Sequence, residues 1–282
     1  MLLFVAHDPG ARKHVLPLFE YGQAQGLAAR FIDLAAPQHA EPRSVFQNKS
    51  IGLLVTGWSV NQAEWPWVLA AREVPTCRVS VTGNPYLEWL IESQPAAMEA
   101  AGLERIRGCK KNFPLVSVFL PDFGAPAGSL NCLVNLLGQS ALAGCRPVIR
   151  PHPRDPQRNC AQTTNRDLGP GGAVWDWECR VSTPALLAAS VCSLTFGSTV
   201  SMESLALGTP SAYFQIGWDY KDIDRLYSNH SSVPRLRCAR ELFEFVSVAN
   251  TCRGSHTKVL VENYLGATVH AWAAFQKHIF DN

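Results

Sequence analysis

Short apolar runs with the composition of buried β-strands alternate with helix-like stretches along most of this 282-residue chain. The runs LLFVA (2–6) and IGLLVTG (51–57) are apolar without alternation, which is typical of strands covered on both faces of a parallel sheet. Between them, the stretch 11–25 repeats apolar residues at helical spacing and stops at Gly26. Because parallel strands need crossover connections of this kind, the alternation predicts an α/β protein.

The alternation occurs in two series, which predicts two Rossmann-like domains. The first series ends near residue 84, and the strand PLVSVFLPDF (114–123) opens the second. We therefore predict a reduced N-terminal domain over 1–84 and a C-terminal domain over 85–282, whose final amphipathic helix (259–280) packs back on the first domain. Ligands of such sheets bind at the carboxyl ends of the strands, so two facing domains predict a site in the cleft between them.

The remaining elements follow from the same patterns. Further strands are predicted at 27–35, 76–83, 146–152, 172–177, 191–196 and 210–216. Further helices are predicted to start near Pro66 and to cover 85–107, 129–143, 183–190 and 199–207.

Composition narrows the classes of protein to consider. A hydrophobic content of 47% with 17% charged residues is that of a soluble globular protein. The formal charge of +2, without a basic run, argues against nucleic acid as a partner. The longest apolar stretches hold about a dozen residues, fewer than the roughly 20 that span a bilayer, and the N-terminus lacks a basic leader. We expect a cytoplasmic protein, with peripheral attachment to the inner face of the membrane left open.

Cysteine and metal-ligand spacing indicate no metal site, and no cofactor is expected. The nine cysteines form no CxxC motif and no Cys/His pair at zinc spacing. Buried reduced thiols are therefore the expected state of these residues.

The stretch LTFGSTVSMESLALGTP (194–210) predicts a phosphate site. Gly197 allows a tight turn after a buried strand, and Ser198 is placed to cap the next helix. Free backbone N–H groups at a helix start, together with the hydroxyls of Ser198 and Thr199, suit a phosphate. Glu203, one turn into the helix, is placed to accept both hydroxyls of a ribose. The alternative is an ordinary capped helix of an α/β domain.

The stretch VIRPHPRDPQ (148–157) predicts a rigid cationic turn at the end of a neighbouring strand. Flanking prolines restrict the backbone around His152, which fixes the direction of its imidazole. Arg150 and Arg154 on either side add positive charge. Such a turn suits a pyrophosphate leaving group, by neutralising it or by donating a proton. A surface proline-rich turn with a solvated histidine is the alternative.

The start of the first predicted helix carries an unusual number of cations. Arg12, Lys13 and His14 follow Gly10 in the first turn, where the helix dipole disfavours positive charge by roughly 0.3–1 kcal/mol per residue. This placement is explained by a docked anion or acceptor, or else the cations are simply solvated.

The sequence offers three candidates for a general base at the carboxyl end of a strand. Asp8 follows the first strand at its carboxyl end, and His7 competes with it for the role. Asp122 follows the first strand of the second series in the same way.

The two motifs together resemble a known superfamily. VIRPHPR followed by FGSTVSMESLALGTP looks like the donor-nucleotide half of two-domain GT-B glycosyltransferases and of the similarly folded UDP-GlcNAc 2-epimerases. The His-Pro and Ser-Thr pair is most similar to bacterial capsule and lipopolysaccharide transferases that use CMP-sugars, including sialyl- and polysialyltransferases. VTGNP (81–85) also resembles an interdomain strand-turn of this superfamily, so the likeness covers mainly residues 81–214.

The resemblance implies an inverting, metal-independent glycosyltransferase of surface polysaccharide biosynthesis. It implies that His152 and the pair Ser198 and Thr199 contact the donor phosphate and that Glu203 contacts the ribose. The nucleotide-sugar is then a substrate rather than a cofactor, and the acceptor is a glycan or lipid-linked sugar. Two alternatives stay open: a nucleotide-sugar epimerase or hydrolase on the same scaffold, and a non-catalytic nucleotide- or glycan-binding protein.

Overall fold

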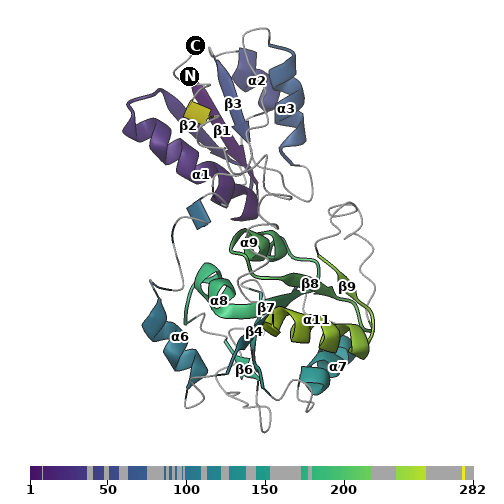
Figure 1. Ribbon diagram of the computed structural model, residues 1–282. Helices are drawn as coiled ribbons and strands as arrows, with labels where there is room; N and C mark the ends of the chain where they lie inside the picture. Colours follow the sequence, from purple (N-terminus) through teal and green to yellow (C-terminus); the bar gives the residue numbers. More distant parts are fainter. Residues whose placement is uncertain are drawn as a thin grey trace. The chain divides into compact units, whose positions relative to one another are not determined.

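The computed structural model divides the chain into two compact units, Met1–Trp89 with Gly266–Asn282 (unit 1) and Leu90–Leu265 (unit 2) (Figure 1). Whether these units are separate domains divided near residue 84 stays a prediction. The structure describes residues 1–7, 9–36, 41–47, 51–56, 63–74, 86, 89–90, 93, 97, 99–108, 113–121, 127–137, 144–152, 173–176, 180–217, 233–251 and 275–276.

Unit 1 contains a parallel sheet in the order β2-β1-β3. In chain order its elements are β1 (Leu2–Ala6), α1 (Pro9–Ala24), β2 (Ala29–Asp33), α2 (Pro42–Gln47), β3 (Leu53–Thr56) and α3 (Trp65–Arg72). The central strand β1 is buried on both faces, as its unbroken apolar run predicts. Leu3 and Val5 belong to the cluster that α2 and α3 cover, whereas Phe4 and Ala6 belong to the cluster that α1 covers.

A side chain from the C-terminal segment completes the core on the α1 side. Phe275 is 1% exposed, and its ring centroid lies 6.1 Å from that of Phe4 and 6.4 Å from that of Tyr21. The neighbouring Gln276 donates a hydrogen bond from Nε2 to the Tyr21 hydroxyl over 3.2 Å. Phe4 and Phe275, about 270 positions apart along the chain, therefore belong to the same hydrophobic core.

Unit 2 contains a six-stranded parallel sheet in the order β6-β5-β4-β7-β8-β9. Counted from β4, this is the order 3-2-1-4-5-6 of a doubly wound dinucleotide-type domain, which confirms the predicted α/β class with Rossmann-like units. Its elements are α6 (Ala100–Arg107), β4 (Leu115–Phe119), α7 (Ala127–Leu137), β5 (Arg146–Arg150), β6 (Val174–Trp175), α8 (Thr183–Ala189), β7 (Ser190–Thr195), α9 (Val200–Ala206), β8 (Ser211–Phe214), β9 (Arg235–Leu236) and α11 (Ala239–Thr251).

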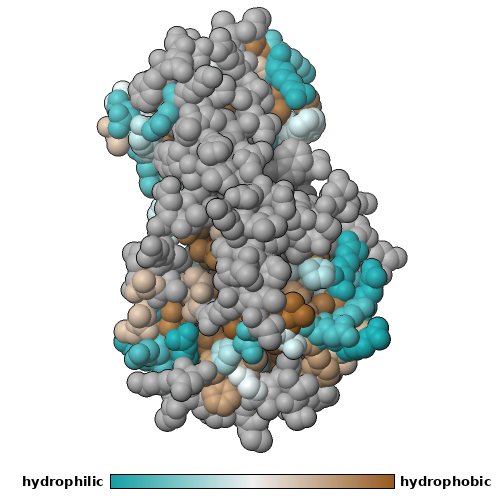
Figure 2. Space-filling model, viewed as in Figure 1, coloured by the Kyte–Doolittle hydropathy of each residue, from teal (hydrophilic) through white to brown (hydrophobic). Residues whose placement is uncertain are grey.

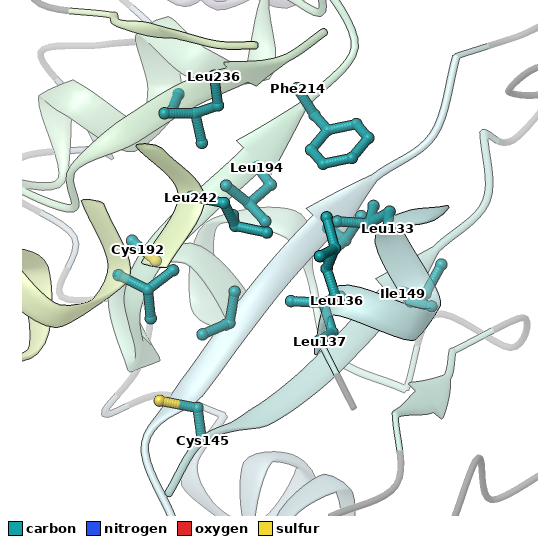
Figure 3. Close-up of a cluster of buried hydrophobic side chains, with 14 of the residues drawn as sticks. Leu133, Leu136, Leu137, Cys145, Ile149, Cys192, Leu194, Phe214, Leu236 and Leu242 are labelled. Carbon is teal, nitrogen blue, oxygen red and sulfur yellow. The ribbon is translucent and has the colours of Figure 1, made fainter. Parts of the chain in front are cut away.

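Two hydrophobic clusters cover the two faces of this sheet. Helices α7 and α11 contribute to one cluster, and Figure 3 shows their leucines gathered with residues of β5, β7 and β8. Helices α6 and α8 contribute to the other cluster, which contains Leu115 and Val148. Burial raises the pKa of Cys145, and burial followed by the neighbouring Cys145 raises the pKa of Cys192, so both thiols remain protonated at neutral pH.

Helix α11 was not predicted, although its pattern is visible in the sequence. Leu242, Val246 and Ala249 repeat at helical spacing and are buried against the sheet. On the opposite side Arg240 and Glu244 form an exposed i,i+4 ion pair, in the region where Figure 2 shows hydrophilic side chains over α11. Helix α2 and strand β9 were also missed because each is too short to show a period.

Some predictions fall on residues outside the described part. These are the strand at 76–83 and all but two residues of the C-terminal helix. The single helix predicted over 85–107 is wrong, because α6 covers only Ala100–Arg107 and the non-helical backbone of Glu99 precedes it. Within the described ranges, no helix has both the length and the apolar character that crossing a bilayer requires.

Candidate functional site

The carboxyl ends of β5 and β7 lie at one edge of the sheet in unit 2, on either side of β4. Phe119 of β4 aligns with Arg150 at the end of β5 and with Thr195 at the end of β7. Adjacent strands are about 4.8 Å apart, so the ends of β5 and β7 are separated by roughly 10 Å. The strand order reverses between β4 and β7, and ligands of such sheets bind outside the carboxyl ends at this switch point.

The turn after β7 is built by one glycine and one serine. Gly197 has a φ of 97°, a value that residues with a side chain rarely adopt. The Ser198 hydroxyl accepts a hydrogen bond from the Val200 N–H over 3.3 Å. The expected cap needs correction, because the N-cap residue is Thr199, whose exposed side chain makes no capping hydrogen bond. Ser198 thus stabilises the turn before α9 and is not the N-cap residue of that helix.

Two hydroxyl groups that sequence reasoning missed, on α9 and β8, stabilise this turn through hydrogen bonds. Ser201 donates to the Ser198 carbonyl oxygen over 2.9 Å, and its oxygen lies 3.0 Å from the Tyr213 hydroxyl oxygen. Since Ser201 has a single proton, Tyr213 is the donor in the second contact. The resulting relay, a chain of two hydrogen bonds from Tyr213 through Ser201 to the Ser198 carbonyl oxygen, connects β8 and α9 to the backbone of the turn.

A second group of buried hydroxyls joins β7, α9 and β8. Ser193 lies 2.8 Å from both Ser204 and Ser211, and Ser204 donates to the carbonyl oxygen of Thr209 over 2.9 Å. All four residues are buried. The signal in the sequence was the alternation of hydroxyl and apolar residues along β7, which places Ser193 and Thr195 on the face toward α9.

Glu203 lies on the buried side of α9. Its exposed fraction is 6%, and Ser204 and Leu205 next to it are also buried. A carboxylate at this position is not displayed on an open surface. Contact between Glu203 and a ribose therefore stays a prediction.

The turn after β5 begins with a buried proline and continues to His152, which is half-buried. Arg150 differs from the expectation of a phosphate ligand. Its guanidinium is 5% exposed and donates from Nη2 to Asp176 Oδ2 in an internal ion pair. The reason is tertiary: Asp176 follows the neighbouring strand β6 and already neutralises this cation. Arg154 and Asp122 lie outside the described residues.

The end of β1 in unit 1 is held by a carboxylate that sequence reasoning missed. Glu64 is 1% exposed, and its Oε1 accepts the backbone N–H of His7 over 3.0 Å. Glu64 occupies the N-cap position of α3 but makes no capping hydrogen bond there, because its side chain reaches β1 instead. The only signal was an acid directly before Trp-Pro at a helix start. Asp8, the other candidate base, lies outside the described residues.

Two of the cations at the start of α1, Arg12 and Lys13, have partners within the protein. Arg12 forms an ion pair with Asp33 at the end of β2, and the Lys13 ammonium lies 5.5 Å from the ring centroid of Tyr86. The expected anion at Gly10, Arg12 and Lys13 was an explanation for uncompensated charge. Asp33 and Tyr86 interact with two of these cations, and an anion or acceptor at Gly10, Arg12 and Lys13 stays a prediction.

The described residues contain no cluster of three or more His, Cys, Asp or Glu side chains that could hold a metal ion. The groups brought together at the edge of unit 2 are hydroxyls, backbone N–H groups and one imidazole. Such groups are suited to bind an anion and to donate protons to it.

No protein-family model matches the chain, and no curated protein sequence matches it either. Several solved protein structures do match the chain. A UDP-GlcNAc 2-epimerase from Neisseria meningitidis bound to UDP-GlcNAc has a TM-score of 0.59 at 11% identity, with 100% of both chains covered. The glycotransferase of kitacinnamycin has a TM-score of 0.59 at 13% identity, covering 98% of this chain and 97% of the other.

A third solved structure, a variant of the wall teichoic acid polymerase TagF, has a TM-score of 0.51 at 12% identity and covers 100% of this chain and 88% of the other. Identities this low establish a shared fold and leave the activity to be argued separately. The chain therefore has the GT-B type of fold that its motifs predict.

Proposed function

We propose that this protein is a glycosyltransferase that moves a sugar from a nucleotide-sugar donor to a glycan or lipid-linked acceptor in surface polysaccharide biosynthesis. The observation that carries the proposal is the edge of unit 2, where the turns after β5 and β7 lie on either side of β4, next to the switch point between β4 and β7. His152 follows one strand and the Gly197 turn follows the other.

In the proposed reaction the acceptor oxygen attacks the anomeric carbon of the donor sugar, and the bond from that carbon to the phosphate oxygen breaks. His152, Ser198 and Thr199 donate hydrogen bonds to the departing phosphate, and Arg154 adds positive charge. A base from unit 1, Asp8 or His7, takes the proton of the acceptor hydroxyl. A single displacement of this kind inverts the anomeric centre, and in this scheme it needs no metal ion.

Binding of nucleotides tests the proposal directly. Thermal unfolding is measured with CMP, CDP, UDP and GDP, because a ligand at 100 times its Kd adds about 2.7 kcal/mol of stability. We expect at least one nucleotide to raise the Tm of the wild type and of Arg240→Ala, which changes the exposed α11. The same nucleotide should raise the Tm of His152→Ala much less. Stabilisation by none of them would contradict the proposal.

An epimerase or hydrolase is the second candidate, favoured by the end-to-end likeness to a 2-epimerase structure that contains UDP-GlcNAc. Incubation with UDP-GlcNAc in the absence of any acceptor separates the two reactions. Conversion of this donor would support the epimerase or hydrolase, whereas nucleotide release only with an added acceptor supports transfer. Nucleotide binding without turnover of any donor would support a non-catalytic binding protein.

A further inference from the structure

A buried ion pair in unit 2 lies at the end of β5, two residues before His152. Arg150, the last residue of β5, and Asp176, the residue after β6, have side chains that are 5% and 0% exposed. Arg150 Nη2 donates to Asp176 Oδ2. The pair therefore connects the carboxyl ends of two neighbouring strands.

The same two side chains also bind the segment that leads into α8. Arg150 Nη1 lies 3.4 Å from Thr183 Oγ1, which belongs to the first turn of α8. Asp176 Oδ1 accepts the backbone N–H of Arg180 over 3.1 Å, and the Asp176 N–H donates to the Ile149 carbonyl oxygen over 2.9 Å. One ion pair thus joins β5, β6 and the start of α8.

Stability does not explain why the chain uses charges here. Moving two ions out of water costs free energy that their attraction only partly offsets, so an apolar pair of the same volume commonly holds a fold equally well. Arg150 Nε is buried and has no hydrogen-bond partner among the described residues, which raises that cost. What the charges provide is a defined direction and register, which apolar contacts do not impose.

The element that needs this register is the turn carrying His152. On one side β5 is paired with β4 along its whole length, and the Leu120 N–H donates to the Arg150 carbonyl oxygen over 3.0 Å. On the other side β6 contains two residues and lies at the edge of the sheet, so on that side the ion pair adds a restraint that backbone pairing supplies only weakly. Only Pro151, which is buried and has a restricted φ, separates Arg150 from His152. A displacement of Arg150 is therefore transmitted to His152 rather than absorbed between them.

We propose that Arg150 and Asp176 are positioning residues, which hold His152 where it meets the phosphate of the nucleotide donor. The role of His152 in this statement rests on the proposed function. The mechanical part, that the ion pair sets the position of His152, stands without it.

The test replaces the pair by apolar residues of similar volume, Arg150→Met with Asp176→Leu, in the full chain. The ring signals of His152 are followed by NMR in the free protein and are assigned with His152→Gln. We expect the double variant to fold with a urea midpoint near that of the wild type, because the core stays filled. We expect the His152 signals to shift or to broaden into several conformers.

A control variant separates positioning from a general loss of stability. Leu242→Ala truncates a fully buried side chain on α11, in the hydrophobic cluster to which α7 and α11 contribute. We expect it to lower the urea midpoint while the His152 signals stay as in the wild type. If the double variant does not fold, Arg150→Lys carries the same test, since it keeps the charge and loses the two-pronged contact with Asp176 and Thr183.

Nucleotide affinity provides the second measurement. For a nucleotide that binds the wild type, we expect the Kd to rise roughly tenfold or more in the double variant, as small misplacements of binding groups commonly cause. Unchanged His152 signals in a folded double variant, or in Arg150→Lys, would overturn the positioning role. If the wild type binds no nucleotide, the proposed function fails, and the NMR comparison still decides whether the pair positions His152.

Discussion

Replacing Tyr213 by phenylalanine should reduce a loss of stability that we expect of the wild type in alkaline solution. Tyr213 lies in β8 and is 1% exposed. Burial raises the pKa of its hydroxyl to about 12, although the hydrogen bond with Ser201 and the charge of Arg235 lower it in part. In the relay below the Gly197 turn, the neutral phenol donates to Ser201. A phenolate would have to accept from Ser201, which then could not donate to the Ser198 carbonyl.

The sign and size of the effect follow from proton linkage. The ordinary pKa of a tyrosine is 10.0, so between about pH 10 and pH 12 the folded protein binds more protons at this position than the unfolded chain. The free energy of unfolding must then fall as the pH rises through this window. The contribution is fully present below pH 10 and fully lost above pH 12. A difference of two pKa units corresponds to about 3 kcal/mol.

Urea unfolding at a series of pH values from about 9 to 11.5 measures this slope. We expect the wild type to lose stability across the series and Tyr213→Phe to lose less, by an amount that grows with pH. The matched control is Tyr21→Phe, which removes the hydroxyl that accepts from Gln276 in unit 1. This control should keep the wild-type slope. Equal slopes in Tyr213→Phe and the wild type would refute the reasoning.

Three further changes test other features of the fold. Gly197→Ala should lower the free energy of unfolding by about 1–3 kcal/mol because φ is 97° there, whereas Gly128→Ala, whose added Cβ meets no atom within 4 Å, should be neutral or stabilising in urea unfolding. Phe275→Ala should cost about 3–5 kcal/mol and speed amide hydrogen exchange in β1, and unchanged exchange there would contradict the shared core. Ser193→Ala should cost about 1–3 kcal/mol by leaving Ser211 without this contact, and a neutral result in urea unfolding would contradict the hydroxyl network.

Local patterns in the sequence were enough to predict the α/β class. The strands β1 and β4 appear where apolar runs predict them, and β5 and β7 lie within or next to the strands predicted at 146–152 and 191–196. Each end of α9 lies within one residue of the predicted helix 199–207. These signals are carried by neighbouring residues, since strand burial and helix termination depend on a few consecutive side chains. The same reasoning placed the turns after β5 and β7 at one edge, because all strands of a parallel sheet end on the same side.

The partners of charged and polar side chains were decided by the tertiary structure alone. Arg150, predicted to contact a phosphate, pairs with Asp176 inside the protein, and Arg12, predicted to meet an anion, pairs with Asp33. The role of Tyr213 had no signal of its own, and Glu64 had only its place before Trp-Pro, because the partners of both side chains lie on other segments of the chain.

Local patterns in the sequence by themselves were enough to locate most of the longer strands and helices and the strand ends at which the candidate residues stand. Only the tertiary structure decided whether a given charge or hydroxyl is used inside the protein or left for a ligand. The physical reason is that burial periodicity is a local property of the chain, whereas compensation of a buried charge depends on which distant strand lies next to it.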